Sequence, residues 1–563
     1  MKKHYETHVE DTDKLISVAG PVLDYKSWYE QYRKLMEEQA QRKYGLYTPT
    51  SEGDDDFPSI TGMIARYSAL GLTNEQMTEN PVWKDLTGNG HDLQMKNFAW
   101  GGMSGVGGYG DENYQTFYKF TLDDYVFIAS PPGVKHMNFT FRVTGLQPGN
   151  KLTLTFFGTT NTVYGIWDKD GIYTVDADIV EAGKPTYFYN GYGATRGEFT
   201  IEILPLYPGA LVFDGVNDYG VCDNFPILTK EKGYTVVALR QWDQDFLNTT
   251  LTGGLLSTRN YSTGEGVAFK KIESSNKGYW NLGAGGIIDF AKSPFTWQTS
   301  KQYNNVGILK GDKNHGKPLC VGCGLSGGQQ CGRFAIWELV FLDHDATEEE
   351  LNKIKDYFVK TYPWLFPDQA WTVVGKTNED EDRATIANIT GNGNDLVCLN
   401  LGFIEGSGYN EEGEYAGYLV TDGVDDKITS STFEMGNDWT VIGDWELINT
   451  GKNDNAGIVK FDSIVIYNYN PILINIKNGR NNLIPDQNTV NAICSDGRIY
   501  SKDWKESIYN EETESTSKNL LTIGYSGNIY TKIAFKNLAI YPTVLSKEDC
   551  IKAYNYLQTL KAK

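Results

Sequence analysis

The chain carries one series of short motifs twice. Residues 87–93 read Thr-Gly-Asn-Gly-His-Asp-Leu, and residues 211–219 read Leu-Val-Phe-Asp-Gly-Val-Asn-Asp-Tyr. Residues 390–396 and 419–427 repeat them in the same order. The first motif recurs after 303 residues and the second after 208, so the first copy holds about 95 additional residues between its motifs. Such a repetition indicates two homologous domains, one of which contains an inserted module.

Length and composition favour several all-β domains. A chain of 563 residues is too long for a single core. Its 60 glycines and 36 tyrosines suit short strands joined by tight turns. We therefore expect an all-β protein with an N-terminal arm at 1–60, a first repeat at 61–363 that is interrupted by an inserted sandwich at 109–208, and a second repeat at 367–563.

Local patterns support this division. In the insertion, residues 139–143 and 152–156 alternate in period two around a Gly-Leu-Gln-Pro-Gly turn. About a hundred residues suffice for a sandwich of seven or eight strands. Each repeat is expected to end in a strand and a short helix, because a hydroxyl and a carboxylate three residues apart form an N-terminal cap. These capping pairs are Thr347 with Glu350 and Ser546 with Asp549.

Charge and cysteine usage limit the cellular setting. The formal net charge of −21 disfavours nucleic acid as a partner, because acidic surfaces repel phosphate backbones. The polar N-terminus shows no secretory signal, and no stretch approaches 18 apolar residues, so we expect no membrane span. Seven scattered cysteines do not suggest a disulfide framework, and they fit a chain made in a reducing cytoplasm.

The arm carries a predicted helix over 25–44, which Asp24 could cap and Gly45 could end. One face of this helix is aromatic and apolar, with Tyr25, Trp28, Tyr32 and Leu35 at helical spacing. This face could pack on the first repeat, or it could dock the chain onto a partner. The acidic segment at 51–56 would separate the arm from the first repeat.

The order of motifs resembles the LamG-like jelly rolls of the concanavalin A-like lectin and glucanase superfamily. In the first copy the resemblance rests on Asp85 and on residues 88–92, 213–219 and 347–351. The second copy departs from it, with Asn388, Thr421 and Lys427 where the first has Asp85, Phe213 and Tyr219. The resemblance implies two jelly-roll sandwiches, the first with a smaller sandwich inserted, and leaves function open.

The Asp-Gly-Val motifs have two interpretations. A structural turn would use glycine for a positive φ angle and the acidic side chains for local backbone amides. The resemblance also implies calcium, because some LamG-like domains bind it with loop oxygens, which suit this hard ion. The candidate ligands are Asp214, Asn217 and Asp218 in the first copy, and Asp422, Asp425 and Asp426 in the second.

A cysteine-rich segment offers a less favoured metal site. His315, Cys320, Cys323 and Cys331 lie within 17 residues, and four such ligands could hold zinc. A single Cys-x-x-Cys is a weak signal, however. The alternatives are a glycine-rich loop with buried or free thiols, or a redox pair.

The chain shows no catalytic motif that we can identify. The glucanase arrangement Glu-x-Asp-x-x-Glu is absent from both repeats, as are a Gly-x-Ser-x-Gly elbow and a phosphate-binding loop. We therefore expect a protein that is not an enzyme. Aromatic side chains near turns could instead stack on sugar rings. These are Trp100, Tyr109, Tyr192, Trp242, Trp280 and Trp297.

The arm and the tandem sandwiches together resemble virion proteins of tailed phages of gut bacteria, including crAss-like phages. The resemblance implies a head-fibre, tail-fibre or decoration protein that is made in the host cytoplasm. It would join other virion proteins through the arm, form a homo-oligomer and display sandwiches that bind host surface glycans. The alternatives are a bacterial carbohydrate-binding surface protein and a glycan-degrading enzyme of the glucanase superfamily.

Overall fold

The structure, a computed structural model, describes most of residues 56–562. The described residues are 56–108, 117–120, 125–128, 136–146, 149–156, 162–178, 186–192, 199–226, 234–243, 246, 250–258, 268–271, 277–280, 287–289, 319–325, 329–411, 415–448, 457–461, 464–467, 472–476, 480–484, 490–501, 504–508, 519–526 and 529–562. In several strands only the backbone is described. The predicted docking helix, with Tyr25, Trp28, Tyr32 and Leu35, lies outside these residues.

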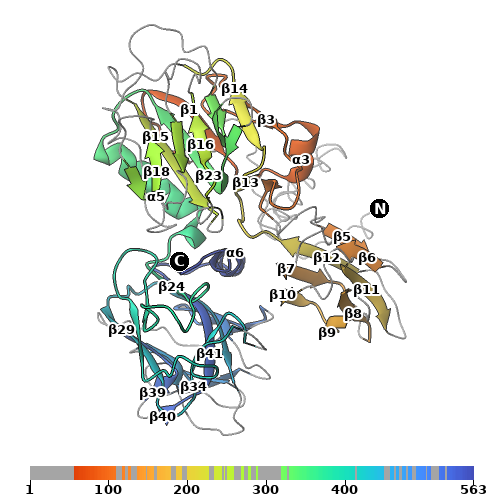
Figure 1. The fold of residues 1–563 in the computed structure, drawn as a ribbon, viewed down its shortest axis with the longest axis vertical. Coiled ribbons are helices and arrows are strands. Elements are labelled where there is room, and N and C mark those ends of the chain that lie inside the picture. Colours follow the sequence, from red (N-terminus) through yellow and green to blue (C-terminus); the bar gives the residue numbers. More distant parts are fainter. Residues whose placement is uncertain are drawn as a thin grey trace, which may run out of the picture. The chain divides into compact units, whose positions relative to one another are not determined.

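The first repeat is a sandwich of two sheets (Figure 1). One sheet contains β1 (Met63–Ser68), β4 (Gly105–Val106), β13 (Leu211–Asp214), β15 (Thr235–Trp242) and β23 (Arg333–Leu342). The other contains β2 (Val82–Trp83), β3 (Leu93–Lys96), β14 (Tyr219–Cys222), β16 (Gly253–Ser257), β17 (Ala268–Lys271), β18 (Lys277–Trp280), β19 (Ile287–Asp289), β20 (Leu319–Val321), β21 (Cys323–Leu325) and β22 (Gln329–Cys331). Among the described residues of this repeat are the helices α3 (Asn74–Glu79) and α5 (Glu348–Thr361).

The second repeat follows the same plan. Its first sheet contains β24 (Gln369–Thr372), β27 (Gly408–Tyr409), β28 (Leu419–Val420), β30 (Thr440–Leu447), β35 (Val490–Cys494), β36 (Arg498–Ser501), β37 (Glu506–Ile508) and β41 (Ile533–Tyr541). Its second contains β25 (Thr385–Ile386), β26 (Leu396–Leu399), β29 (Lys427–Phe433), β31 (Gly457–Phe461), β32 (Ile464–Tyr467), β33 (Ile472–Ile476), β34 (Arg480–Ile484) and β38 (Asn519–Ile523). A small hairpin, β39 (Tyr525–Ser526) and β40 (Ile529–Tyr530), and helix α6 (Lys547–Leu557) complete it.

One long strand organises each repeat. β23 pairs with β1 and β13 along one edge and with β15 along the other, and nine of its ten residues are buried. β41 pairs with β24, β28 and β30 in the same way, and all nine of its residues are buried. A strand buried on both faces is expected to be rich in apolar residues, and both segments are, although Glu338 interrupts the first and Lys536 and Asn537 interrupt the second. The all-β sandwich fold expected from the sequence is confirmed.

The insertion folds as two four-stranded sheets of its own. One contains β5 (Phe117–Phe120), β7 (His136–Thr144), β10 (Gly171–Asp178) and β12 (Phe199–Leu204). The other contains β6 (Tyr125–Ile128), β8 (Lys151–Phe156), β9 (Thr162–Trp167) and β11 (Thr186–Tyr192). A separate apolar cluster that includes Phe141, Leu152 and Ile201 fills the space between them.

The insertion leaves and rejoins its host at a single point. The backbone N–H of Leu206 donates to the carbonyl of Gly108 at 2.8 Å, and Tyr207 donates to Gly107 at 2.8 Å. In the second repeat the chain instead turns within a few residues, where Gly417 donates to the carbonyl of Asn410 at 2.8 Å. Hydrogen-bonded backbone ends thus meet at this point in both repeats, with the insertion between them in the first and a short turn in the second.

The two closing helices begin at the predicted caps. Thr347 Oγ1 accepts from the N–H of Glu350, whose carboxylate in turn accepts from the N–H of Thr347. Ser546 Oγ accepts from the N–H of Asp549 at 3.1 Å. The helix α3, which was not expected from the sequence, has a capping box of its own formed by Thr73 and Gln76.

One apolar core is shared by both repeats and the insertion. It is built from Leu204 of the insertion, Trp337 of β23, Trp364 of the connecting 3-10 turn η3 (Pro363–Leu365), and Tyr556 of α6, among others. The Trp337 indole donates to the carbonyl of Pro208 at 2.8 Å, and its ring meets that of Tyr556 edge to face at 5.9 Å. This shared core joins the closing helix of the second repeat to the central strand of the first.

A buried ion pair in the first repeat has no counterpart in the second. In the first, Arg66 Nε lies 3.2 Å from the Glu338 carboxylate, and both side chains are at most 4% exposed. The hydroxyl of Tyr362 also donates to Glu338 at 2.8 Å. Ala370 and Asn537 take the equivalent register positions in the second repeat. The buried ion pair is therefore not part of the common plan.

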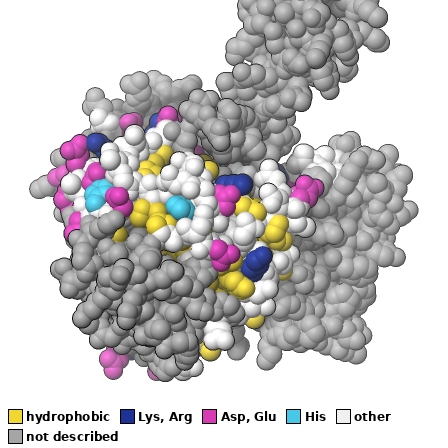
Figure 2. All heavy atoms as spheres, turned by 90° about the horizontal axis from the view of Figure 1, so that it is seen from above, with side chains coloured by type: hydrophobic (Ala, Val, Ile, Leu, Met, Phe, Trp, Pro, Cys, Tyr) yellow, Lys and Arg dark blue, Asp and Glu magenta, His cyan; other side chains and the backbone are white. Residues whose placement is uncertain are grey.

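On the face drawn in Figure 2, acidic, basic and hydrophobic side chains are interspersed, and the hydrophobic groups are small and separated by polar atoms. Among the described residues, no helix combines the length and apolar character needed to cross a bilayer.

We predict that the shared core couples the unfolding of the two repeats. Replacing Trp337 by Ala leaves a cavity at the shared core and should cost about 3–5 kcal/mol of folding free energy. In scanning calorimetry, residues 56–562 of the unmodified chain should unfold in one transition. The Trp337→Ala variant should unfold in two, one for each repeat. Trp445→Ala is the matched control, because this buried tryptophan belongs to the core of the second repeat alone. A lowered but still single transition for Trp337→Ala would contradict the coupling.

Candidate functional site: the paired acidic turns

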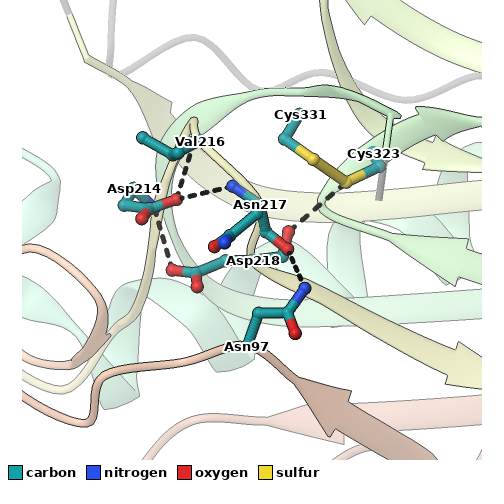
Figure 3. Close-up of a disulfide and its surroundings, with 7 residues drawn as sticks. All are labelled: Asn97, Asp214, Val216, Asn217, Asp218, Cys323 and Cys331. Atoms are coloured by element: carbon teal, nitrogen blue, oxygen red, sulfur yellow. Dashed lines mark hydrogen bonds between the residues drawn. A yellow bond between two sulfur atoms is a disulfide. The ribbon is translucent and has the colours of Figure 1, made fainter. Parts of the chain in front are cut away.

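Each repeat carries an acidic turn between a strand of its first sheet and a strand of its second. In the first repeat, β13 ends at Asp214, whose Oδ1 accepts from the N–H groups of Val216 at 2.7 Å and Asn217 at 3.3 Å. Asp218 Oδ2 accepts from the N–H of Asp214 at 3.1 Å. Figure 3 shows how these side chains fold back onto their own backbone. Such local bonds close a tight turn without help from a ligand.

Gly215 is required by this geometry. Its φ of 78° lies in the left-handed region, and a Cβ there would stand 2.8 Å from the side chain of Arg333. A residue outside the motif also holds the turn, since Asn97 Nδ2 donates to the carbonyl of Asn217 at 2.9 Å (Figure 3).

The second repeat reproduces these bonds. Asp422 Oδ1 accepts from Val424 at 2.7 Å and from Asp425 at 3.4 Å, and Asp426 Oδ2 accepts from Asp422 at 2.7 Å. Asn400 donates to the carbonyl of Asp425 at 3.1 Å, as Asn97 does in the first repeat. Gly423 has a φ of 75°. The arrangement is the structural turn that the sequence suggested.

Only the second turn combines three carboxylates. Asp422, Asp425 and Asp426 can each bring an oxygen to within 4.8 Å of the other two. In the first repeat Asn217 stands where Asp425 stands in the second, so that turn has two carboxylates. Calcium prefers clusters of carboxylate and carbonyl oxygens. Within the described part of the chain, the residues of the second turn therefore fit calcium better than those of the first.

The inner aspartate of each turn is fully buried. Asp218 and Asp426 are both 0% exposed. Burial, together with the nearby charge of Asp214, raises the pKa of Asp218 to about 7. Burial also raises the pKa of Asp426 above its usual range. Each turn thus holds a carboxyl group whose ionisation the fold resists.

Two asparagines and two serines that support these turns were not expected from the sequence. Asn97 and Asn400 share a left-handed φ of 66°, and Ser104 and Ser407 each accept a backbone N–H from the same loop. All four follow the 303-residue offset of the first motif, so extending that comparison a few residues would have found them.

The cysteines do not form the zinc ligand set that the sequence offered as an alternative. Cys323 and Cys331 lie directly opposite each other on β21 and β22 and form a disulfide (Figure 3). Two of the four expected ligands are therefore bonded to each other, which also corrects the expectation of free thiols. Cys320 is a buried thiol on β20, and burial raises its pKa to about 12. His315 lies outside the described residues.

The disulfide had a local sequence signal. The two cysteines are eight residues apart and enclose the glycine-containing run Gly-Leu-Ser-Gly-Gly, which favours a hairpin that brings its ends together. The disulfide lies beside the acidic turn, with Cys323 Sγ 3.4 Å from the carbonyl oxygen of Asp218.

The proposed sugar-stacking aromatics do not gather at one surface. Trp242 is 4% exposed and packs between Phe246 and Phe334, so the expectation of an exposed platform is wrong there. Trp100 is half-buried, and Phe98 stacks on its ring at 4.6 Å. Tyr109 and Trp297 lie outside the described residues. For Tyr192 on β11 and Trp280 on β18, only the backbone is described.

No protein-family model and no curated protein sequence matches the chain. Among solved structures, it is similar to Trypanosoma rangeli sialidase in complex with sialic acid, with a TM-score of 0.26 and 8% identity over 68% of each chain. It is also similar to the binding domain of botulinum neurotoxin serotype D, with a TM-score of 0.23 and 10% identity over 59% of this chain and 88% of the other. Likenesses this distant carry no argument about activity, and the fold assignment rests on the sheets themselves.

We predict that Asp218 makes stability depend on pH. Unfolded aspartate titrates near 3.9, so between about pH 4 and pH 7 the folded state holds a proton that the unfolded state releases. The stabilisation is complete below pH 4 and is lost as the pH rises through about 7. Denaturant unfolding in the presence of EDTA should show this fall.

In the Asp218→Asn variant the fall should flatten, which leaves the variant more stable than the unmodified chain at pH 8, by an amount on the order of a few kcal/mol. Asp356→Asn, on the exposed side of α5, is the control and should retain the full pH dependence. An unchanged slope in Asp218→Asn would show that this carboxyl group is not responsible.

Proposed function

We propose that the chain is a non-enzymatic display protein of a tailed-phage virion, with lectin-like sandwiches that bind host surface glycans. The observation that carries this proposal is the shared core around Trp337 and Tyr556, which joins both repeats and the insertion into one body. A body of this kind presents several sandwiches in fixed relation, and simultaneous contacts raise avidity without any new interaction. The virion setting and the homo-oligomer are supported by the sequence resemblance.

The carboxylates of the acidic turns and of the buried ion pair support a role without catalysis. The Asp214 and Asp422 carboxylates are engaged by backbone amides, and Glu338 is engaged by Arg66 and Tyr362. Most enzymes that hydrolyse a glycosidic bond use two carboxyl groups that face a common cleft. Carboxylates that are committed to turns and to a buried ion pair serve the fold instead.

We predict binding of glycans without turnover. Capsular polysaccharides of gut bacteria are immobilised, and retention of the purified chain is measured by interferometry while released reducing ends are counted. The expected result is saturable retention and no release above a blank without protein. Release that a single Asp or Glu substitution abolishes would replace this proposal with the glycan-degrading alternative.

The virion setting has a separate test. Mass spectrometry of purified phage particles should find the chain in them at a stoichiometry that the particle symmetry allows. A chain that is found only at the bacterial surface would favour the bacterial carbohydrate-binding alternative.

A further inference from the structure

The turn of the second repeat brings three carboxylates close enough to share one ion. Asp422, Asp425 and Asp426 each offer a side-chain oxygen, and these oxygens lie within 4.8 Å of one another. Calcium binds its oxygen ligands at about 2.3–2.6 Å, so two ligands on opposite sides of one ion are about 4.6–5.2 Å apart. The three oxygens are therefore already at distances that a single calcium ion can span.

The buried member of this group carries an oxygen without a hydrogen bond. Asp426 is 0% exposed, and its Oδ2 accepts from the N–H of Asp422 at 2.7 Å. Its Oδ1 is buried and forms no hydrogen bond with the described residues. A buried carboxylate oxygen without a partner is destabilising, and a metal ion is one of the groups that can satisfy it. This oxygen therefore points to a cation as well as to a turn.

The negative charge of the group is not balanced nearby. Among the described residues, none of the three carboxylates forms an ion pair with a lysine or an arginine. The basic residue that follows directly, Lys427, lies over the ring of Tyr525 instead, with its Nζ 4.8 Å from the ring centroid. Carboxylates that share a small volume repel one another, and a divalent cation removes this repulsion. Because all the ligands are oxygens, they suit a hard ion such as calcium.

The turn can hold an ion and keep its own hydrogen bonds. Those bonds use Asp422 Oδ1 and Asp426 Oδ2, and they leave the other oxygen of each carboxylate and the whole Asp425 carboxylate for a ligand role. Asp425 is exposed and Asp422 is half-buried, so one side of the group faces solvent. Calcium takes 6–8 oxygen ligands, and water on this side can supply those that the protein does not.

The first repeat shows what the third carboxylate adds. Asp218 is also 0% exposed and has an Oδ1 without a hydrogen bond, so the buried part of the turn is the same in both repeats. Asn217, however, stands where Asp425 stands in the second repeat. The first turn therefore presents two negative charges in place of three. Calcium affinity depends on the number of charged ligands, which favours the second turn.

We propose that the acidic turn of the second repeat binds one structural calcium ion through Asp422, Asp425 and Asp426, and that the corresponding turn of the first repeat binds none. The turn connects β28 of one sheet to β29 of the other, so the ion stabilises the crossing between the two sheets of the second repeat. The site does not depend on the proposed glycan binding.

The test measures calcium binding by equilibrium dialysis of the full chain after treatment with EDTA. At a calcium concentration that saturates the unmodified protein, the Asp425→Asn variant should bind one ion fewer per chain, because losing a charged ligand should weaken binding at least about tenfold. Asp425 accepts none of the hydrogen bonds that close the turn, so this variant should fold normally.

Stability gives a second measurement. Calcium should raise the melting temperature of the unmodified chain, since a ligand that binds only the folded state stabilises it, and Asp425→Asn should lose this rise. Magnesium at the same concentration should raise it less, because magnesium requires near-ideal octahedral geometry and gives up its water reluctantly.

Two further variants make the comparison between the repeats decisive. Asn217→Asp supplies the third carboxylate to the first turn and should gain one calcium ion per chain. Asp356→Asn makes the same change of charge as Asp425→Asn on the exposed side of α5, and it should bind calcium as the unmodified chain does. Equal calcium binding by the unmodified chain and Asp425→Asn would refute the site in the second turn. An Asn217→Asp chain that gains no ion would refute the role given to the third carboxylate.

Discussion

Residues 56–562 depend on an apolar core to which both repeats and the insertion contribute side chains. Trp337 comes from the central strand of the first repeat, Trp364 from the connecting turn, and Tyr556 from the last helix of the chain. Each of these side chains would face water if its partners were removed, and burying an aromatic side chain contributes about 1.5–3 kcal/mol. The relation between the repeats is therefore set by packing, and a short connecting turn alone would leave it free.

Beneath this common core, the two repeats show which features the fold requires and which are particular to one copy. The acidic turn recurs with the same donors, the same acceptors and nearly the same glycine φ. The Arg66–Glu338 pair does not recur, because Ala370 and Asn537 take its place. A buried ion pair can be replaced by other residues during divergence, because desolvation offsets much of the attraction between its charges.

Local signals in the sequence predicted local structure well. The caps at Thr347 and Ser546, the all-β character and the turn at Asp214 each depend on residues a few positions apart. The exposure of Trp242 was not predictable in this way, because Phe334 buries it from a strand 92 residues later in the chain. The pairing of Arg142 with Glu548 joins residues 406 positions apart and requires the insertion and the last helix to meet. No periodicity or motif in either segment carries that information.

The single crossing point at Gly108 and Leu206 has a consequence for how such a chain can change. The departing and returning backbones are hydrogen-bonded neighbours, so the register of the host strands at this point depends on the two ends and not on the segment that connects them. The second repeat joins the same ends with a short turn. A gene exchange that replaced one guest by another between these ends would alter what the body carries, while the host strands kept their register. The position is a natural splice site for acquiring new surface modules.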